Sequence, residues 1–269
     1  RTLLGWPGPE NLMTLLDDLC ADLQAESDEL ADVLVGLDED GWETMTAAEP
    51  WRVKDQISHL AWNDDATVRA LTQPVEFLAA KPEGPQAIQA MVDQVIVDYQ
   101  HLPGTEMLSW FREARGSLIQ AFAGRDPKER MPWYGPEMSL ASKLTARFME
   151  TWAHGYDVFD ALGTTKPRTD RVRHVVFLGL QALPNAYTAQ GRELPDRPVR
   201  LEVTSPSGEL WRMGPSDTDD VVRGSAFDLA LVVTQRLNPG DADLQPQGGV
   251  AEEWLQIAQA FAGPPGAGR

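Results

Sequence analysis

The chain has 269 residues and a formal net charge of -18, from 41 acidic against 23 basic side chains. Such an acidic surface repels nucleic acid and anionic membranes, so we expect a small molecule as the partner. No apolar run approaches the roughly 20 residues of a membrane span, and the sequence does not open on a basic-then-apolar leader, which predicts a cytoplasmic protein. At this length, the chain can form two domains with a sizeable buried core.

Several common catalytic patterns are absent from the sequence. It contains no GxxxxGK[ST] loop, no GxGxxG after a strand and no GxSxG elbow. The usual sequence motifs for ATP binding, for dinucleotide binding and for a catalytic nucleophile triad are therefore missing. Cys20 is the single cysteine, which excludes an internal disulfide and a cysteine-based zinc cluster. Because no basic residue stands near it in sequence, we expect a small buried side chain rather than a reactive thiol.

The first predicted helix covers residues 10–35, where leucines recur at helical spacing and acidic residues occupy the other faces. A loop follows in which Trp42 and Trp51 flank a break at Gly41 and Pro50. Aromatic residues in such a loop are more typical of side chains that plug the end of a bundle than of ligand-binding groups.

The second predicted helix covers residues 53–71. Its apolar stripe includes Val53, Ile57 and Leu60, whereas His59 lies on another face beside Asn63 and small alanines. A lone histidine on a helix is more often a surface or core residue than a ligand. His59 is therefore a candidate ligand whose partner must come from another element.

Two more helices are predicted, one between Pro85 and Pro103 and one over residues 105–122 that ends at Gly124. A Pro/Gly-rich connection, DPKERMPWYGPEM, then leads into the next helix. Its Trp133 and Tyr134 could wall a pocket or could equally be packing residues.

The stretch 139–162 predicts one long helix that carries Glu150, His154 and Asp157. Glu150 and His154 stand four residues apart, so these two potential metal ligands point the same way. The alternative is a solvated polar strip in which Arg147 and Glu150 pair weakly. This face and the His59 face both carry alanines, and together they could hold a metal and a substrate between them.

Beyond Gly163, we expect a helical run over residues 169–190 that acts as a bridge. A β-hairpin follows, with Val199, Leu201 and Val203 alternating before a turn at 205–208, and then helices over 217–237 and 251–261. These elements predict an α+β protein with two domains, a helical bundle over residues 1–190 and a small α+β domain over 191–269.

The segments VKDQISHLAWND and ARFMETWAHGYDV resemble the metal-binding half of the DinB-like four-helix-bundle superfamily. More closely, the chain resembles the mycothiol-dependent maleylpyruvate isomerases of actinobacteria. The resemblance implies a divalent metal held by His59, Glu150 and His154. It also implies that residues 191–269 form an α+β domain similar to sterol-carrier proteins.

In that family the C-terminal domain contributes an arginine to the active site, in a segment that often ends Leu-x-Gly-Arg. The resemblance implies that Arg236 is this residue, although Gln235 replaces the glycine. Arg223, expected at the start of the same helix, is a second candidate. The alternative for Arg236 is an ordinary arginine that interacts with its own helix dipole. We further expect the C-terminal domain to close over the metal and supply this substrate-binding cation.

Two imidazoles and one carboxylate form a three-ligand site with open positions for water, substrate or a thiolate. Zinc is the expected ion, and nickel or iron(II) would fit the same ligands. Because metal-bound histidines usually donate their other ring N–H to an oxygen atom, Asn63 and Asp157 are candidate supports, unless Asp157 is a solvated helix residue.

These observations leave three functions open. The first is a metal-dependent isomerase or transferase that acts on a small, carboxylated substrate with a low-molecular-weight thiol such as mycothiol as co-substrate. The second is a metalloenzyme that uses bound water without a thiol. The third is a non-catalytic carrier that binds an apolar ligand in the C-terminal domain. We expect a monomer or homodimer in each case.

Overall fold

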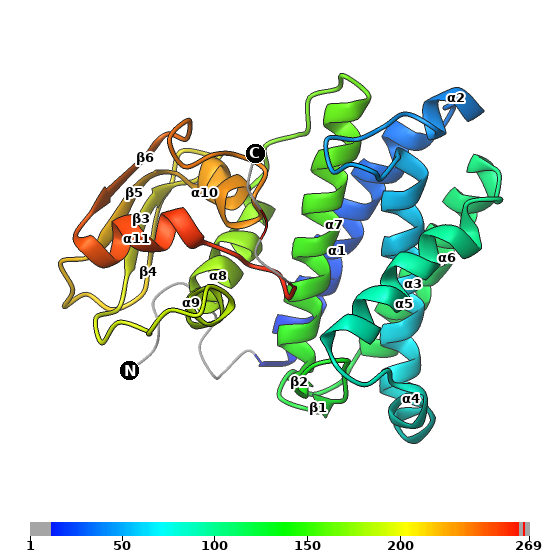
Figure 1. Cartoon of the computed structure of the whole chain (residues 1–269), viewed down its shortest axis with the longest axis horizontal. Helices are drawn as coiled ribbons and strands as arrows, with labels where there is room; N and C mark the ends of the chain where they lie inside the picture. Colours follow the sequence, from blue (N-terminus) through cyan, green and yellow to red (C-terminus); the bar gives the residue numbers. More distant parts are fainter. Residues whose placement is uncertain (1–11, 264–265, 267–269) are drawn as a thin grey trace. The chain divides into compact units, whose positions relative to one another are not determined.

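The computed structural model describes residues 12–263 and 266, which form an α+β fold as the sequence predicted (Figure 1). They divide into two compact units, a bundle unit that ends at Lys166 and a C-terminal unit that begins at Pro167. Within the described part of the chain, no helix is both long enough and apolar enough to cross a membrane.

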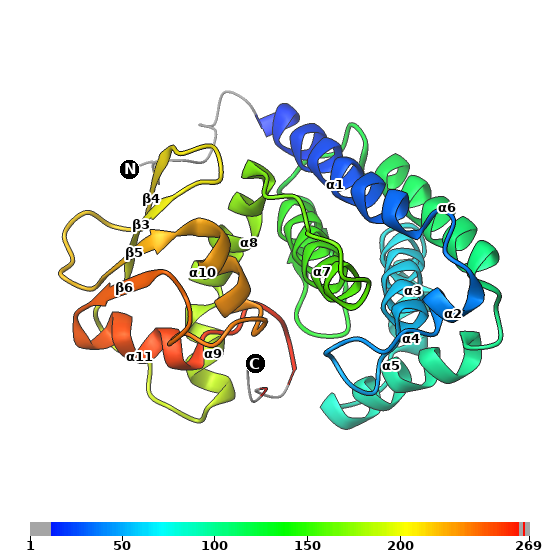
Figure 2. The same ribbon diagram turned by 90° about the horizontal axis from the view of Figure 1, so that it is seen from above.

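The bundle unit consists of helices of very different length and one short two-stranded ribbon. In chain order they are α1 (Leu12–Leu34), α2 (Glu39–Trp42), α3 (Val53–Thr72), α4 (Pro74–Ala80), α5 (Pro85–Tyr99), α6 (Gly104–Phe122), β1 (Arg130–Met131), β2 (Met138–Ser139) and α7 (Leu140–Ala161). The four long helices α1, α3, α6 and α7 pack on one another, and Figure 2 shows α3 and α7 nearly along their axes. The predicted helical bundle is therefore confirmed.

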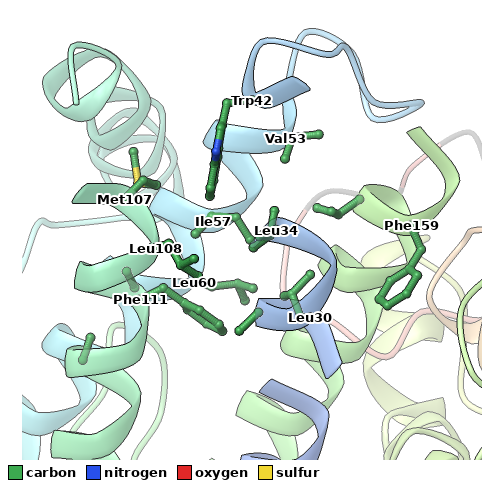
Figure 3. Close-up of a cluster of buried hydrophobic side chains, with 14 residues drawn as sticks. Leu30, Leu34, Trp42, Val53, Ile57, Leu60, Met107, Leu108, Phe111 and Phe159 are labelled. Carbon is green, nitrogen blue, oxygen red and sulfur yellow. The ribbon is translucent and has the colours of Figure 1, made fainter. Parts of the chain in front are cut away.

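The apolar stripes of these helices meet in a common core (Figure 3). Ile57 and Leu60 of α3 are fully buried there, as are Met107 and Phe111 of α6. Trp42 belongs to the same core and is only 2% exposed, so it plugs the bundle as expected. Its ring lies against the start of α6, where a Cβ on Gly104 would stand 2.1 Å from it, so only glycine fits at this position.

A buried ionic network joins α3, α6 and α7 inside the bundle. The carboxylate of Asp64 accepts a hydrogen bond from Arg115 Nε at 2.7 Å and another from Arg147 Nε at 2.9 Å. Arg147 also donates to the carbonyl oxygen of Leu60 at 3.1 Å. All three ionic side chains are at most 2% exposed. Arg147 thus pairs with Asp64 across the bundle, and the alternative of a weak pair with Glu150 on a solvated strip is wrong.

Helix α7 has the bounds that its sequence predicted. Ser139 is the N-cap, and its Oγ accepts a hydrogen bond from the backbone N–H of Ser142 at 3.1 Å. At the other end Gly163 adopts φ +64°, in the left-handed region that terminates helices. The two caps fix the length of the helix that carries Glu150 and His154.

The C-terminal unit combines short helices with a four-stranded sheet. Its elements are a 3-10 turn (Asp170–Val172), α8 (Arg173–Gln181), α9 (Leu183–Ala189), β3 (Arg200–Thr204), β4 (Leu210–Met213), β5 (Val221–Ser225), α10 (Ala226–Val233), β6 (Leu244–Gln247) and α11 (Gly249–Ile257). The strand order is β4-β3-β5-β6, with β3 parallel to β5 and the outer pairs antiparallel. The expected hairpin corresponds to β3 and β4.

The predicted helix over residues 217–237 is wrong in its first half, which contains β5. Val221 and Val222 are buried in this strand, which pairs on both sides. Gly224 adopts φ +128°, which a helix does not allow, and the helix begins only after Ser225, its N-cap. Asp220, directly before this strand, accepts a hydrogen bond from the backbone N–H of Val250 at the start of α11.

The helical run expected as a bridge is two helices, α8 and α9, divided at Ala182. They pack on α10 and α11, and Gly179 of α8 lies so close to Val233 that a Cβ would stand 2.8 Å from that side chain. This packing places them in the C-terminal unit. The contacts therefore divide the chain between Lys166 and Pro167, and not at 190/191 as the composition of the sequence predicted.

Candidate metal centre

The structure brings His59 of α3 together with Glu150 and His154 of α7. Each residue offers one potential ligand atom, and these atoms all lie within 4.8 Å of one another. Glu150 Oε2 is 3.1 Å from His154 Nε2 and 3.5 Å from His59 Nε2. The three side chains are between 12% and 25% exposed, so they are shielded but still reachable from solvent. The two helix faces that the sequence singled out therefore face one another.

The spacing of these atoms suits a small divalent ion. Two ligand atoms bound at about 2.1 Å to one tetrahedral zinc ion lie about 3.4 Å apart. The separations of Glu150 Oε2 from the two Nε2 atoms are close to that value. Two imidazole nitrogens and one carboxylate oxygen also form a donor set typical of zinc, nickel and iron(II). The residues present thus fit the metal that the resemblance implied.

Gln56 sets the tautomer of His154. Its side chain is fully buried on α3, and Oε1 contacts His154 Nδ1 across the interface between α3 and α7. A glutamine carbonyl oxygen accepts only, so Nδ1 carries the proton and donates it. The lone pair of His154 is then on Nε2, the atom that faces Glu150. This hydrogen bond orients the ring for metal binding before any ion arrives.

The charge states of the other two residues also suit a metal. Burial lowers the pKa of His59 to about 4, against the raising effect of its hydrogen bond with Glu150, so its imidazole is neutral at pH 7. Burial opposes ionisation of Glu150, but the neighbouring His154 and His59 outweigh it and hold the pKa of Glu150 well below its ordinary value. A neutral imidazole and an ionised carboxylate are the forms that bind a cation.

Trp51 covers the two histidine rings. Its ring stacks on His154 with a centroid separation of 5.7 Å and an interplanar angle of 14°. It also lies 5.1 Å from the ring of His59. Unlike Trp42, which fills the core, Trp51 is a wall of the candidate metal centre. The expectation that both loop tryptophans plug the bundle therefore holds for Trp42 alone.

The two expected supporting residues have different surroundings. Asn63 lies next to His59, because its Nδ2 is 3.2 Å from His59 Nε2 and donates to the carbonyl oxygen of His59 at 3.0 Å. Asp157 is fully buried on α7, so the alternative of a solvated helix residue is wrong. The alanines expected to leave room also differ among themselves: Ala66 and Ala153 are buried in packing, whereas Ala146 is partly exposed.

The two candidate arginines lie in the C-terminal unit. Arg223 is on strand β5 rather than at the start of a helix, and its Nε donates to Glu202 Oε2 at 2.8 Å on the neighbouring strand. Arg236 follows the C-cap of α10, and its Nη1 donates to the carbonyl oxygen of Thr234 at 2.7 Å. The second contact resembles the alternative considered above, in which the arginine interacts with the end of its own helix.

Gln56 and Trp51 belong to this centre although the sequence did not mark them as members of it. Gln56 did carry a signal, because it stands three residues before His59 and so shares its helix face. Trp51 carried none, because its loop conformation decides where its ring points.

Comparison with known proteins identifies the family. Residues 23–159 match the family model described as the mycothiol maleylpyruvate isomerase N-terminal domain. This match covers more than half of the chain and includes all three candidate ligands. The chain therefore belongs to the mycothiol-dependent maleylpyruvate isomerase family, as the resemblance in the sequence indicated.

Two uncharacterised proteins of Mycobacterium tuberculosis, from strains CDC 1551 / Oshkosh and ATCC 25618 / H37Rv, are each 40% identical to this chain over 255 residues. The alignments cover 93% of this chain and 97% of each relative.

The fold is similar to the crystal structure of the mycothiol-dependent maleylpyruvate isomerase, with a TM-score of 0.60 at 16% sequence identity. That match covers 86% of this chain and 92% of the crystallised one. A variant of the same enzyme with one histidine replaced by alanine matches with a TM-score of 0.59. At this level of identity the likeness establishes the shared α+β fold.

Proposed function

We propose that this protein is a divalent-metal-dependent enzyme that acts on a small, carboxylated molecule by thiol-assisted isomerisation or transfer. The observation that supports it best is the convergence of His59, Glu150 and His154 from two helices, with ligand atoms within 4.8 Å of one another. Membership of a family whose model is described by mycothiol and maleylpyruvate favours a thiol co-substrate and an acidic substrate. Zinc is the proposed ion.

The residues of the centre have different proposed roles. His59 and His154 present imidazole nitrogens and Glu150 presents a carboxylate oxygen, while Gln56 holds the ring of His154 in position. When bound, a divalent metal with these ligands lowers the pKa of a coordinated thiol or water and so supplies a nucleophile at neutral pH. Trp51 shields the histidine rings from bulk water.

The proposed roles of the remaining site residues follow from their surroundings or from the family. Asn63 supports His59, which it contacts, and Asp157 is proposed as a further support from within α7. Arg236 is proposed to bind a substrate carboxylate, because a guanidinium grips a carboxylate through two parallel hydrogen bonds. Arg223 is the weaker candidate, since Glu202 already neutralises it.

Metal analysis tests the first part of this proposal. The purified wild type is expected to hold one divalent ion per chain, and His154→Ala and His59→Ala are expected to lose it. His101→Ala is the matched control, since His101 is exposed and far along the chain from the centre. Equal metal content in wild type, His154→Ala and His101→Ala would contradict the proposal.

A thiol-dependence assay tests the second part. Turnover of maleylpyruvate by the zinc-loaded protein is expected to require mycothiol and to fall strongly in Arg236→Lys, with the fold and metal content preserved. Turnover of a substrate by the zinc-loaded protein without any thiol would favour the second function, in which bound water acts. A protein that binds an apolar ligand but no metal would be the carrier.

A further inference from the structure

A lysine is buried in the bundle unit without an acidic partner. Lys143 of α7 is 3% exposed. Among residues 12–263 and 266, no oxygen atom accepts a hydrogen bond from its Nζ, and it forms no ion pair. Lys54, by contrast, is similarly buried at 4% exposed, but its Nζ donates to Glu43 Oε1 at 2.7 Å. An unpaired buried ammonium is costly, so its presence calls for an explanation.

The head of this lysine lies against the ring of Trp133, which belongs to an aromatic cluster. Its Nζ lies 2.8 Å from the centroid of the Trp133 ring. Trp133 belongs to an aromatic cluster that also contains Trp62 of α3, Phe77 of α4 and Tyr134, in which Trp62 stacks on Tyr134 at 6.0 Å and Phe77 on Trp133 at 5.8 Å. A cation above an indole face gains some stabilisation, but much less than the hydration that burial removes.

The surrounding charges are unusual for so acidic a chain. Along one side of α7, Lys143, Arg147 and Glu150 follow at spacings of four and three residues, so they share a helix face. Arg147 and Arg115 share the single carboxylate of Asp64, which leaves this buried network one positive charge in excess. Lys143 adds another. Burial, and then the charge of Arg147, hold the pKa of Lys143 well below that of an ordinary lysine. A bound anion would compensate Lys143 both for its burial and for the repulsion by Arg147.

This cationic region adjoins the candidate metal centre. Trp62 stands three residues after His59 on α3, and Lys143 stands seven residues before Glu150 on α7, an axial rise of about 10 Å. Between them Ala146 is partly exposed, as are Trp62 and Trp133, so solvent reaches this part of the surface. A small molecule that contacts both the metal and the lysine would therefore lie along this part of α7.

We propose that Lys143 and the aromatic cluster form an anion subsite that takes the carboxylate of a small organic acid, with Trp133 and Tyr134 flanking the rest of the molecule. The subsite deepens the proposed function, on which it rests for the identity of its ligand as the substrate. Under this proposal Trp133 and Tyr134 are walls of a pocket and not only packing residues. In the ligand-free protein the buried lysine destabilises the fold, and binding of an acid removes this destabilisation.

Calorimetric titration with maleate, used as a simple dicarboxylate probe, tests the subsite in the full chain. Lys143→Met keeps the length of the side chain and removes its charge. We expect it to weaken maleate binding at least about tenfold, the usual effect of losing a charged hydrogen bond, and to raise the melting temperature without ligand. Lys54→Met is the matched control, which should bind maleate like the wild type. Lys143→Gln supplies the same comparison if the methionine variant is insoluble.

The outcomes separate this inference from the proposed function. Loss of maleate binding in Lys143→Met, in both zinc-loaded and metal-free protein, supports the subsite whether or not the metal proves catalytic. Equal maleate affinity in wild type and Lys143→Met overturns the subsite and leaves the metal proposal standing. No saturable binding of maleate to the wild type, or a melting temperature that falls in Lys143→Met, also overturns it, since the lysine is then a structural residue.

Discussion

Gln56 and His154 form a hydrogen bond that joins α3 to α7 at the candidate metal centre. Because this bond fixes the proton on Nδ1, we predict that Gln56→Leu lowers the affinity for zinc roughly 10- to 100-fold, as loss of a supporting hydrogen bond to a metal-bound histidine usually does. Competition titration with a chromophoric chelator measures the change.

Gln94→Leu serves as the control for Gln56→Leu, because Gln94 lies on α5 and its side chain donates to Asp98 of the same helix. Gln56→Glu retains an acceptor for the Nδ1 proton and should bind zinc at least as tightly as the wild type. Unchanged affinity in Gln56→Leu would mean that His154 is oriented by its packing against Trp51 instead.

The shared carboxylate of Asp64 gives a second prediction. Asp64→Asn leaves Arg115 and Arg147 buried without a counter-charge, and we expect a loss of about 3–5 kcal/mol in the free energy of unfolding. Urea denaturation followed by circular dichroism measures it. The comparison is Arg125→Ala, which breaks the half-exposed pair with Glu129 and should cost less than about 1 kcal/mol. Similar losses in the two variants would contradict a structural role for the network.

Cys20 gives a prediction about the source of any catalytic thiol. Burial, and secondarily the charge of Asp17, raise the pKa of its thiol to about 11, so at pH 8 very little thiolate is present. Iodoacetamide should therefore alkylate the native protein at least about tenfold more slowly than the protein unfolded in urea. Turnover should be unchanged in Cys20→Ala, since the proposed nucleophile comes from outside the chain. Loss of turnover in that variant would place the thiol within it.

The residue before Arg236 gives a prediction about stability. Gln235 adopts φ +61°, and it is the sole non-glycine residue with a positive φ in the described part of the chain. This is the position where the family motif has glycine. Because a side chain in the left-handed region costs about 1 kcal/mol, Gln235→Gly should raise the free energy of unfolding by about that amount.

The matched control for Gln235→Gly is Gln190→Gly at the end of α9. Gln190 is also a glutamine next to a helix terminus, but its φ is -87°, so its backbone carries no strain that glycine could remove. Gln190→Gly should therefore lower the free energy of unfolding slightly. A stabilising effect at both positions, seen in thermal unfolding, would contradict the strain argument. The observed backbone explains how the chain keeps the turn before Arg236 without the glycine of the motif.

The sequence predicted the long helices well because each repeats its apolar residues along one stripe. Thus α3 and α7 begin and end within one residue of the predicted bounds. The strand β5 was missed for the opposite reason. It is five residues long and central in the sheet, so its apolar and polar residues do not alternate. The acidic residues before it are also typical of a helix N-terminus, which favoured the wrong prediction.

Some features of the candidate metal centre could likewise be predicted from the sequence, and others could not. The spacing of Glu150 and His154 within one helix, and the face that His59 shares with Gln56 and Asn63, are properties of helical geometry, so the sequence by itself determined them. Which face meets which is decided by packing between helices far apart in the chain. Only the tertiary structure could therefore direct Gln56 to His154, turn Arg147 away from Glu150 toward Asp64, and bury Lys143 beside Trp133 without an acid to pair with it.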